Sequence, residues 1–364
     1  MCRAGRSGSR TSSTDTHEHA TPDATQDPMT SHTLCLRRPN GVELELSSRG
    51  ATWLGCHVPM PDGTRRSVVL ACPTQEQQMR QRAFLGATIG RYANRIDHAR
   101  YRHRGHVVRL APNAGSAHQL HGGDGGFHAR EWRVDTVDET QVAMSLVSPD
   151  GDQGFPGELR AWVAYTLVEP MVLEIALRAV TSAETPVCLT NHAYFNLDGD
   201  ARDVRAHRLR IAAPHYLPVD AELIPLGQLA PVAHTSYDFR AGKPIAQDWL
   251  ADAGQTASLG YDHAFLLDPG CAEMREPAVE LWSGDGALSM SIATTLPALQ
   301  FYGGQHLQGI PSRHGGVYTN CAGIALEPQF LPDSPNHPEW PQPPCWLQPG
   351  GVWEHRIRYV FAWR

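Results

Sequence analysis

Hydrophobic and polar residues alternate in short segments along the whole chain. In VELELSS, Val42, Leu44 and Leu46 alternate with Glu43 and Glu45. The same period of two recurs in LEIALRAV at 173–180, LSMSIAT at 288–294 and RIRYVFAW at 356–363. Because successive side chains of a strand point to opposite faces, these segments predict strands that each bury one face.

Helical periodicity is scarce, and PTQEQQMRQRAF at 73–84 is the best candidate for a short helix. Turn residues are plentiful: the chain has 33 glycines and 28 prolines, and PDG occurs at 61–63 and 149–151 between strand-like segments. No period of 20–50 residues repeats, which argues against a propeller or solenoid. We therefore predict an all-β fold, a large antiparallel β-sandwich with few short helices.

The beginning of the chain differs from the rest. It is rich in Ser, Thr, Asp and Arg, and it lacks the apolar stretch of a secretory signal. We predict a disordered tail over residues 1–33, with Met29 as a candidate start, and a single β-sandwich domain over residues 34–364.

Composition narrows the classes of partner. A formal net charge of -7 disfavours nucleic acid and anionic membrane surfaces. Nothing approaches the roughly 18 consecutive apolar residues of a membrane helix. The eight cysteines are scattered without a CxxC pair, as expected for reduced thiols in a cytoplasmic protein.

Candidate chemistry lies in five loop-like segments. In GATIGRYANRI, the pair Asn94-Arg95 offers hydrogen-bond donors and an acceptor to a polyhydroxyl ligand, whereas a lone arginine such as Arg91 is more often structural. In HQLHGGDGGFHAREW, the glycines after His121 would let a ligand approach the backbone closely. For the histidines of this segment, ligand contact and a structural role remain equally open.

The other three segments add acids and a histidine. In TNHAYFNLDG, His192 fits either chemistry or packing. In GYDHAFLL, Asp262 is either a turn residue or a carboxylate that grips sugar hydroxyls. In GIALEPQFL, an apolar strand runs into Glu327, and a buried carboxyl is costly unless it is paired or functional.

Metal and nucleotide motifs are absent from the sequence. It has no HExxH, P-loop, GxSxG or GxGxxG segment. A cupin-like metal site would need HxH spacing with a downstream carboxylate, which the 19 histidines do not provide. We expect no metal ion and no cofactor.

Taken in order, the polar segments resemble those of the aldose 1-epimerases, or galactose mutarotases. GATIGRYANRI, LHGGDGGF, SPDGDQGFPGELRAWVAYTL, TNHAYFNLDG, YLPVD, GYDHAFLL, PALQFYGG and ALEPQFLPDSPNHPEWPQP carry the resemblance, which covers roughly residues 35–364 and is nearest to bacterial cytoplasmic members. It implies a β-supersandwich that interconverts the α and β anomers of free hexoses such as galactose and glucose.

The resemblance also implies roles for individual residues. Glu327 of ALEPQ is the general base and His192 of NHAYFNL is the general acid. His192 must then carry a proton, and Asp262 is a candidate neighbour that would help to hold it. The implied sugar contacts are Asn94, Arg95, His121, Asp262 and Gln300.

Two departures from the family pattern concern the surroundings of the site. The chain has His128-Ala129 where the family often has Asp-Lys, and Gln305 where it commonly has Asn. Both are expected to alter the rim of the site. The alternatives within this fold are a hexose-phosphate epimerase, for which Arg313 is the one nearby basic candidate, and a non-catalytic sugar-binding protein. The preferred hexose, and whether the protein is a monomer or a homodimer, remain open.

Overall fold

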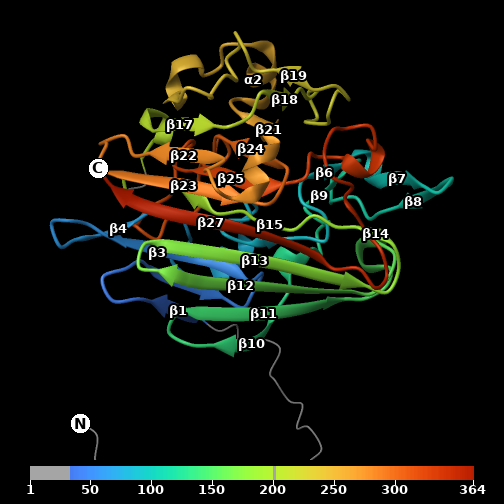
Figure 1. Ribbon diagram of the computed structural model, residues 1–364, viewed down its shortest axis with the longest axis horizontal. Coiled ribbons are helices and arrows are strands. Elements are labelled where there is room, and N and C mark those ends of the chain that lie inside the picture. The colour runs from blue at the N-terminus through green and yellow to red at the C-terminus, as the bar shows by residue number, and fades with distance from the viewer. Residues whose placement is uncertain (1–32, 200–201) are drawn as a thin grey trace, which may run out of the picture. The chain divides into compact units, whose positions relative to one another are not determined.

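The computed structural model describes residues 33–199 and 202–364, and long antiparallel strands form its largest sheet (Figure 1). In order across the sheet, its nine strands are β10 (Arg133–Val137), β11 (Gln141–Ser148), β12 (Leu159–Glu169), β13 (Val172–Thr181), β27 (Trp353–Trp363), β23 (Leu288–Thr294), β22 (Val279–Trp282), β17 (Arg208–Ile211) and β20 (Lys243–Pro244). The alternating apolar positions are buried, as Ile175 and Leu177 in β13 and Ile357 in β27 illustrate. The predicted strands and the all-β fold are therefore confirmed.

Two further antiparallel sheets matter for the site. One has the order β1 (Thr33–Arg37), β2 (Glu43–Ser47), β3 (Thr52–Pro59) and β4 (Arg65–Ser67). The other has the order β16 (Tyr194–Phe195), β25 (Ile324–Gln329), β24 (Ala298–Tyr302), β21 (Asp262–Leu266), β18 (His215–Leu217) and β19 (Ala230–Pro231). Every residue of β25 is buried, so this strand is covered on both faces.

Three aromatic side chains join the three sheets. Trp53 of β3 lies edge-on to Phe195 of β16 and to Tyr359 of β27, with ring centroids 5.7 and 5.2 Å apart. Phe195 and Tyr359 are themselves 5.7 Å apart. Large buried rings contribute much of the stability of a core, so this cluster fixes the place where the sheets meet. Phe195 thereby anchors β16 to the other two sheets.

Helices are short in the described residues. α1 (Gln75–Arg80) begins after Thr74, whose side chain accepts a hydrogen bond from the Gln77 amide as an N-cap. It confirms the predicted helix, although it ends four residues before Phe84. The second is α2 (Ala253–Ser258). Short 3-10 turns cover Asp97–Ala99, Phe127–Ala129, Asp152–Gly154, Val204–Ala206, Ile245–Asp248, Pro269–Glu273 and Ser334–Asn336.

Pairs of very short strands hold the loops above the sheets. They are β5 (Thr88–Ile89) with β15 (Thr190–Asn191), β6 (Arg95–Ile96) with β9 (Gln119–Leu120), β7 (Arg100–His103) with β8 (His106–Arg109), and β14 (Thr185–Pro186) with β26 (Trp346–Leu347). The predicted tail lies outside the described residues apart from Thr33, so the boundary between tail and domain stays a prediction. Within the described ranges, no helix is long and apolar enough to cross a membrane.

Candidate active site

Four polar side chains lie on one face of the six-stranded sheet, those of Asp262, Gln300, Tyr302 and Glu327. The register of β21, β24 and β25 pairs Gln300 with Glu327 and Asp262 with Tyr302. Side chains alternate between the faces of a strand, so Glu327 points away from the face on which Leu326 enters the main core. A register slip of one residue would turn Glu327 into that core, and burial of Leu326 therefore fixes the register.

These side chains line a cavity of about 390 Å³, which we call the sugar cavity. Binding sites for small molecules usually enclose about 300–1,000 Å³, so its size suits one monosaccharide. Glu327 is 1% exposed and His192 is 4% exposed. All seven residues predicted for the site line this cavity, namely Asn94, Arg95, His121, His192, Asp262, Gln300 and Glu327.

His192 is held by its neighbours in the chain. Its amide donates a hydrogen bond to the carbonyl of Ala87 at 2.9 Å, and the Gly86 amide donates to the His192 carbonyl at 2.9 Å. The side chain of Asn191 donates to the Gly86 carbonyl at 2.9 Å. On the other side, Tyr194 pairs with β25, the strand that carries Glu327. The backbone thus positions the imidazole against the carboxyl group.

Aromatic rings surround the His192 imidazole. Tyr194 stacks on it with ring centroids 5.0 Å apart, and His121 meets it edge-on at 5.2 Å. Phe84 lies 5.9 Å away on a tilted plane. These contacts restrict the rotation of the imidazole and keep water from most of its surface.

The nearest distance between the imidazole and the carboxyl group joins His192 Nε2 to Glu327 Oε1 at 3.5 Å. Burial lowers the pKa of His192 to about 3. Burial also raises the pKa of Glu327 well above its ordinary value, and the charge of Asp262 raises it further. Both directions follow from the cost of a charge that is shielded from bulk solvent. The partner of His192 is therefore Glu327 rather than the expected Asp262, and Asp262 acts on Glu327 instead.

Asn94 and His121 hold each other in an unusual backbone conformation. Both lie in the left-handed region, with φ of 64° and 55°. The Asn94 amide donates to His121 Nδ1 at 3.1 Å, and the His121 amide donates to the Asn94 carbonyl at 3.0 Å. Such conformations cost of order 1–3 kcal/mol and cluster at functional sites.

This hydrogen bond fixes the tautomer of His121. Since Nδ1 accepts a hydrogen bond from the Asn94 amide, the neutral imidazole carries its own proton on Nε2. Burial lowers the pKa of His121 well below its ordinary value, which favours this neutral form. His121, His192 and Glu327 bring possible metal-binding atoms within 4.8 Å of one another. However, Nε2 of His121 presents a donor rather than a lone pair, which suits a sugar oxygen better than a metal ion.

Gln300 and Asp262 form a further polar pair. Gln300 Nε2 donates to Asp262 Oδ1 at 2.6 Å, while Gln300 Oε1 is buried with no hydrogen-bond partner among the described residues. Burial raises the pKa of Asp262, and the positive charge of Arg95 opposes that shift. Glu327 Oε2 is also buried without a partner. Unsatisfied buried oxygens at the wall of a cavity are natural acceptors for ligand hydroxyl groups.

Other lining residues were not predicted. Tyr194 and Tyr302 lie within the motifs TNHAYFNLDG and PALQFYGG, but the sequence gives neither of them a role in the site. Phe84 is the last residue of the segment predicted as a helix and lies four residues beyond the end of α1, and nothing in the sequence indicates its φ of 57°. The residues that the sequence reasoning missed are Arg82, Ala83, Phe84, Leu120, Tyr194, Leu223, Tyr302, His306 and Ile310.

Two sequence interpretations are settled by contacts. Arg91 is 2% exposed and donates to carbonyl groups of residues 148, 149, 156 and 157, so its structural interpretation is confirmed. The glycines after His121 serve the chain itself: a Cβ on Gly122 would lie 2.1 Å from the Gly90 carbonyl oxygen. The expectation that they admit a ligand is therefore wrong for Gly122.

Neither departure from the family pattern reaches the sugar cavity. Gln305 is buried, and its Nε2 donates to the carbonyls of Ser258 at 2.8 Å and Tyr261 at 3.3 Å, so it braces the segment that precedes Asp262. His128 lines a different cavity, described below. Neither residue lines the sugar cavity itself, and an effect of either on its rim stays a prediction.

Comparison with known proteins agrees with this architecture. The family model described as aldose 1-epimerase matches residues 32–360. An aldose 1-epimerase from Escherichia coli (strain K12) is 47% identical over 341 residues, which cover 94% of this chain and 98% of that protein. The galactose mutarotase of Homo sapiens is 38% identical, over 88% of this chain and 91% of that protein.

Solved structures show the same likeness. The GalM/aldose epimerase homologue from C. elegans superposes with a TM-score of 0.83 at 29% identity, covering 92% of this chain and 99% of that one. The galactose 1-epimerase from Lactobacillus acidophilus NCFM gives a TM-score of 0.79 at 28% identity, covering 93% and 97%. The chain belongs to the aldose 1-epimerase family.

Proposed function

We propose that the aldose 1-epimerase activity of this chain takes place in the sugar cavity, with Glu327 as general base and His192 as general acid. The observation that carries the proposal is the buried pair itself, with its nitrogen and oxygen 3.5 Å apart in a space the size of one hexose. Two proton-transfer groups that flank one small ligand are what ring opening requires.

The reaction moves two protons and returns both. Glu327 takes the proton of the anomeric hydroxyl, the bond between C1 and the ring oxygen breaks, and His192 gives a proton to that oxygen. The C1–C2 bond then rotates in the open aldehyde. Closure runs the two transfers backwards on the other face of the carbonyl, so the enzyme ends with the protons it began with.

One proton on the pair is sufficient for this cycle. In the empty cavity, burial favours the neutral arrangement, with that proton on Glu327 and with His192 uncharged. Sugar hydroxyl groups that donate to the carboxyl group would stabilise its charged form and so move the proton to His192. Substrate binding would thereby create the acid and base that act on it.

The remaining polar groups would orient the sugar. Arg95 lies in β6, Asn94 directly before it and His121 directly after β9, whereas Asp262 and Gln300 lie on strands of the six-stranded sheet. Hydrogen-bond donors and acceptors are therefore both available to the hydroxyl groups of a sugar ring, and the sugar needs no charged substituent in order to bind. We accordingly propose a free aldohexose as substrate.

A phosphorylated hexose is a poorer fit. Arg313, the basic residue considered for that alternative, donates to Glu45 at 2.8 Å and does not line the sugar cavity. A non-catalytic sugar-binding protein would have no need of a buried carboxyl-imidazole pair. We also propose a cytoplasmic location, which the free thiols of the seven described cysteines support. A monomer or homodimer without nucleic acid remains our expectation for its assembly.

The experiment is polarimetry of freshly dissolved α-galactose and α-glucose. The wild-type protein is expected to speed the drift of optical rotation over that in buffer, and Glu327→Gln and His192→Gln are each expected to abolish most of that acceleration. No acceleration by the wild type would refute the activity. Full activity in both variants would refute the assignment of the two residues while leaving the activity standing.

A further inference from the structure

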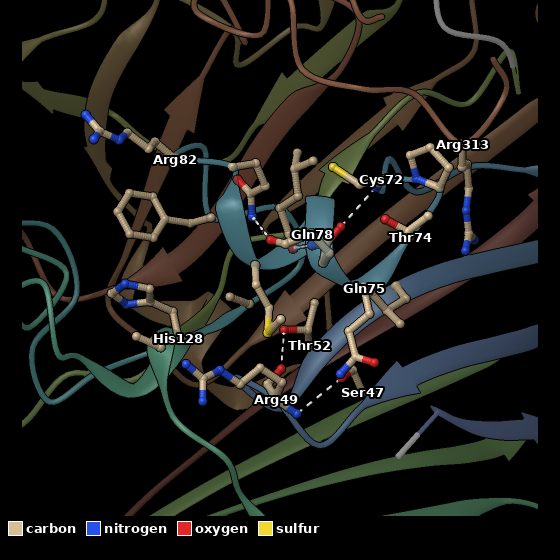
Figure 2. A pocket seen from close by; sticks show the side chains of 18 of the residues that line it. Ser47, Arg49, Thr52, Cys72, Thr74, Gln75, Gln78, Arg82, His128 and Arg313 are labelled. Carbon is tan, nitrogen blue, oxygen red and sulfur yellow. Dashed lines mark hydrogen bonds between the residues drawn. The ribbon is translucent and has the colours of Figure 1, made fainter. Parts of the chain in front are cut away.

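A second cavity, of about 660 Å³, adjoins the sugar cavity. The two share the lining residues Arg82, Phe84 and Leu120. The wall of the second cavity comes from the four-stranded sheet, from α1 and from the loop that carries His128. Figure 2 shows Arg49 and His128 on one side of this space and Arg313 on the other. We call it the arginine cavity.

Its carboxylates are already satisfied. Glu45 accepts from His57 Nε2 at 2.9 Å and from Arg313 at 2.8 Å. Asp124 accepts from the side chain of Asn113 at 3.0 Å and from the Ala114 amide at 2.9 Å. Three arginines face two carboxylates in this lining, so the cavity carries an excess of positive charge.

These contacts leave two of the three arginines without an ion pair among the described residues, Arg49 and Arg82; Arg82 is exposed, whereas Arg49 is partly buried. Its backbone is fixed, because its amide donates to Ser47 Oγ at 3.2 Å and its carbonyl accepts from Thr52 Oγ1 at 2.7 Å, as Figure 2 shows. Its guanidinium makes no ion pair with any described residue, and its Nε is buried without a hydrogen-bond partner. On the same side of the cavity, His128 Nδ1 is likewise buried and unpartnered.

A buried donor of a charged group without a partner is costly, and protein interiors rarely retain one. A guanidinium presents a planar fork of donors that matches the oxygens of carboxylates and phosphates. We propose that the arginine cavity binds the oxyanion of a small molecule, a phosphate or a carboxylate, with Arg49 as its anchor.

The rest of the lining indicates the size and character of the ligand. The volume exceeds that of the sugar cavity and would hold a monosaccharide that carries such a group. Polar side chains such as Gln75 alternate with apolar ones such as Leu54 and Met79. This mixture suits a molecule with hydroxyl groups on an aliphatic frame. The site is separate from the one that holds the reacting sugar, since Phe84 stands between them: its ring meets His128 at 4.8 Å and His121 at 4.7 Å.

Calorimetric titration tests the proposal with three probes: inorganic phosphate, glucose 6-phosphate and glucuronate. Each titration is run in excess galactose, so that the sugar cavity is filled. At least one probe is expected to bind the wild-type protein, and Arg49→Met is expected to weaken that binding by about ten-fold or more, or ~1.4 kcal/mol. Equal affinity for phosphate and glucose 6-phosphate would identify a free oxyanion as ligand, and preference for a sugar-borne group would identify a sugar phosphate or sugar acid.

Three further variants separate binding from folding. Arg49→Lys keeps the charge but loses the fork, so an intermediate affinity is expected. His128→Asp places a carboxylate next to Arg49 and is expected to compete with the probe. Arg275→Gln, an exposed arginine paired with Glu273, is the matched control and should bind normally.

The outcome is independent of the proposed function, because polarimetry of Arg49→Met should give wild-type rates with galactose. Binding that Arg49→Met leaves unchanged would overturn the proposal. So would the absence of binding by all three probes, or displacement of the bound probe by galactose.

Discussion

The sugar cavity and the arginine cavity share a wall, yet they treat charge in opposite ways. In the sugar cavity, burial lowers the pKa of His192 to about 3 and raises that of Glu327 well above its ordinary value. In the arginine cavity, the hydrogen bond from His57, helped by Arg313, lowers the pKa of Glu45 to about 2. Burial therefore favours the neutral, protonated form of Glu327, whereas the contacts of Glu45 favour its charged form.

The difference follows from the strands that carry the two acids. β25 is buried along its whole length, so Glu327 is shielded from bulk solvent, and no lysine or arginine among the described residues forms an ion pair with it. β2 buries one face and leaves Glu45 half-open between His57 and Arg313. A group that must exchange a proton needs a small energy difference between its two states, whereas a group that holds a salt bridge needs a large one. The fold supplies these two environments on adjoining walls.

The largest expected difference between the two cavities comes from replacing one charged residue in each, Glu327 in the sugar cavity and Arg49 in the arginine cavity. Glu327→Gln should reduce kcat by at least about 10²–10⁴-fold, since it removes one proton-transfer group. Its melting temperature should be unchanged or higher, because the amide no longer pays the cost of burying a carboxyl group. Arg49→Met should leave kcat unchanged. Polarimetry gives kcat and thermal unfolding gives the melting temperature of both variants. A large loss of kcat in Arg49→Met would mean that the arginine cavity contributes to catalysis.

The dependence of kcat/KM on pH sharpens the same point, since this ratio reports the free enzyme. The rate should stay level as the pH falls through 6.5, the ordinary pKa of histidine, because the lowered pKa of His192 delays its protonation to about pH 3. On the alkaline side the pair loses its one proton, and the rate should fall by about ten-fold per pH unit beyond the raised pKa of Glu327. Polarimetry over a wide pH range, corrected for the spontaneous reaction, gives the profile. An acid limb centred near pH 6.5 would contradict the burial of His192.

Much of this arrangement could be predicted from the sequence. Alternation identified the strands because each has one face in the core, as Leu44 and Ile292 do. The cost of a buried acid at the end of an apolar strand singled out Glu327, and the other polar segments offered five further candidates. The family resemblance assigned their roles and added Gln300, and all seven residues line one cavity.

What the sequence could not supply depends on segments that meet only in the folded chain. Phe84 lies far from His192 in sequence, and a positive φ at a phenylalanine follows no local rule. The sequence could not show which acid lies beside His192 for the same reason. The answer depends on the register of β21, β24 and β25, which places Gln300 between Asp262 and Glu327. The lack of a partner for Arg49 depends on where His57 and Arg313 find theirs.

Removal of the shared wall is the next smaller perturbation. Phe84→Ala should open the sugar cavity into the arginine cavity and remove the ring contacts with His192 and His121. Aromatic contacts of this kind contribute about 0.5–1.5 kcal/mol, so KM for galactose should rise by roughly 2- to 12-fold. Phe84→Leu, which keeps an apolar wall, is the control and should show a smaller rise. Steady-state polarimetry gives both constants, and an unchanged KM in Phe84→Ala would mean that the ring does not confine the sugar.

The smallest effect concerns stability in acid. Burial lowers the pKa of His128 from 6.5 to about 4, so between these values the unfolded chain binds a proton that the folded chain excludes. The contribution of this residue to stability is complete above pH 6.5 and is lost as the pH falls towards 4, by up to about 1.4 kcal/mol per pH unit. His128→Asn should therefore unfold at nearly the wild-type temperature at pH 7.5 and at a higher temperature than wild type at pH 5. His192 shares the lowered pKa, but its replacement would also remove activity, so His128 isolates the electrostatic term from catalysis. If the two melting curves keep the same separation at both pH values, His128 takes up its proton in the folded state, and the arginine cavity is wetter than its unpartnered Nδ1 indicates.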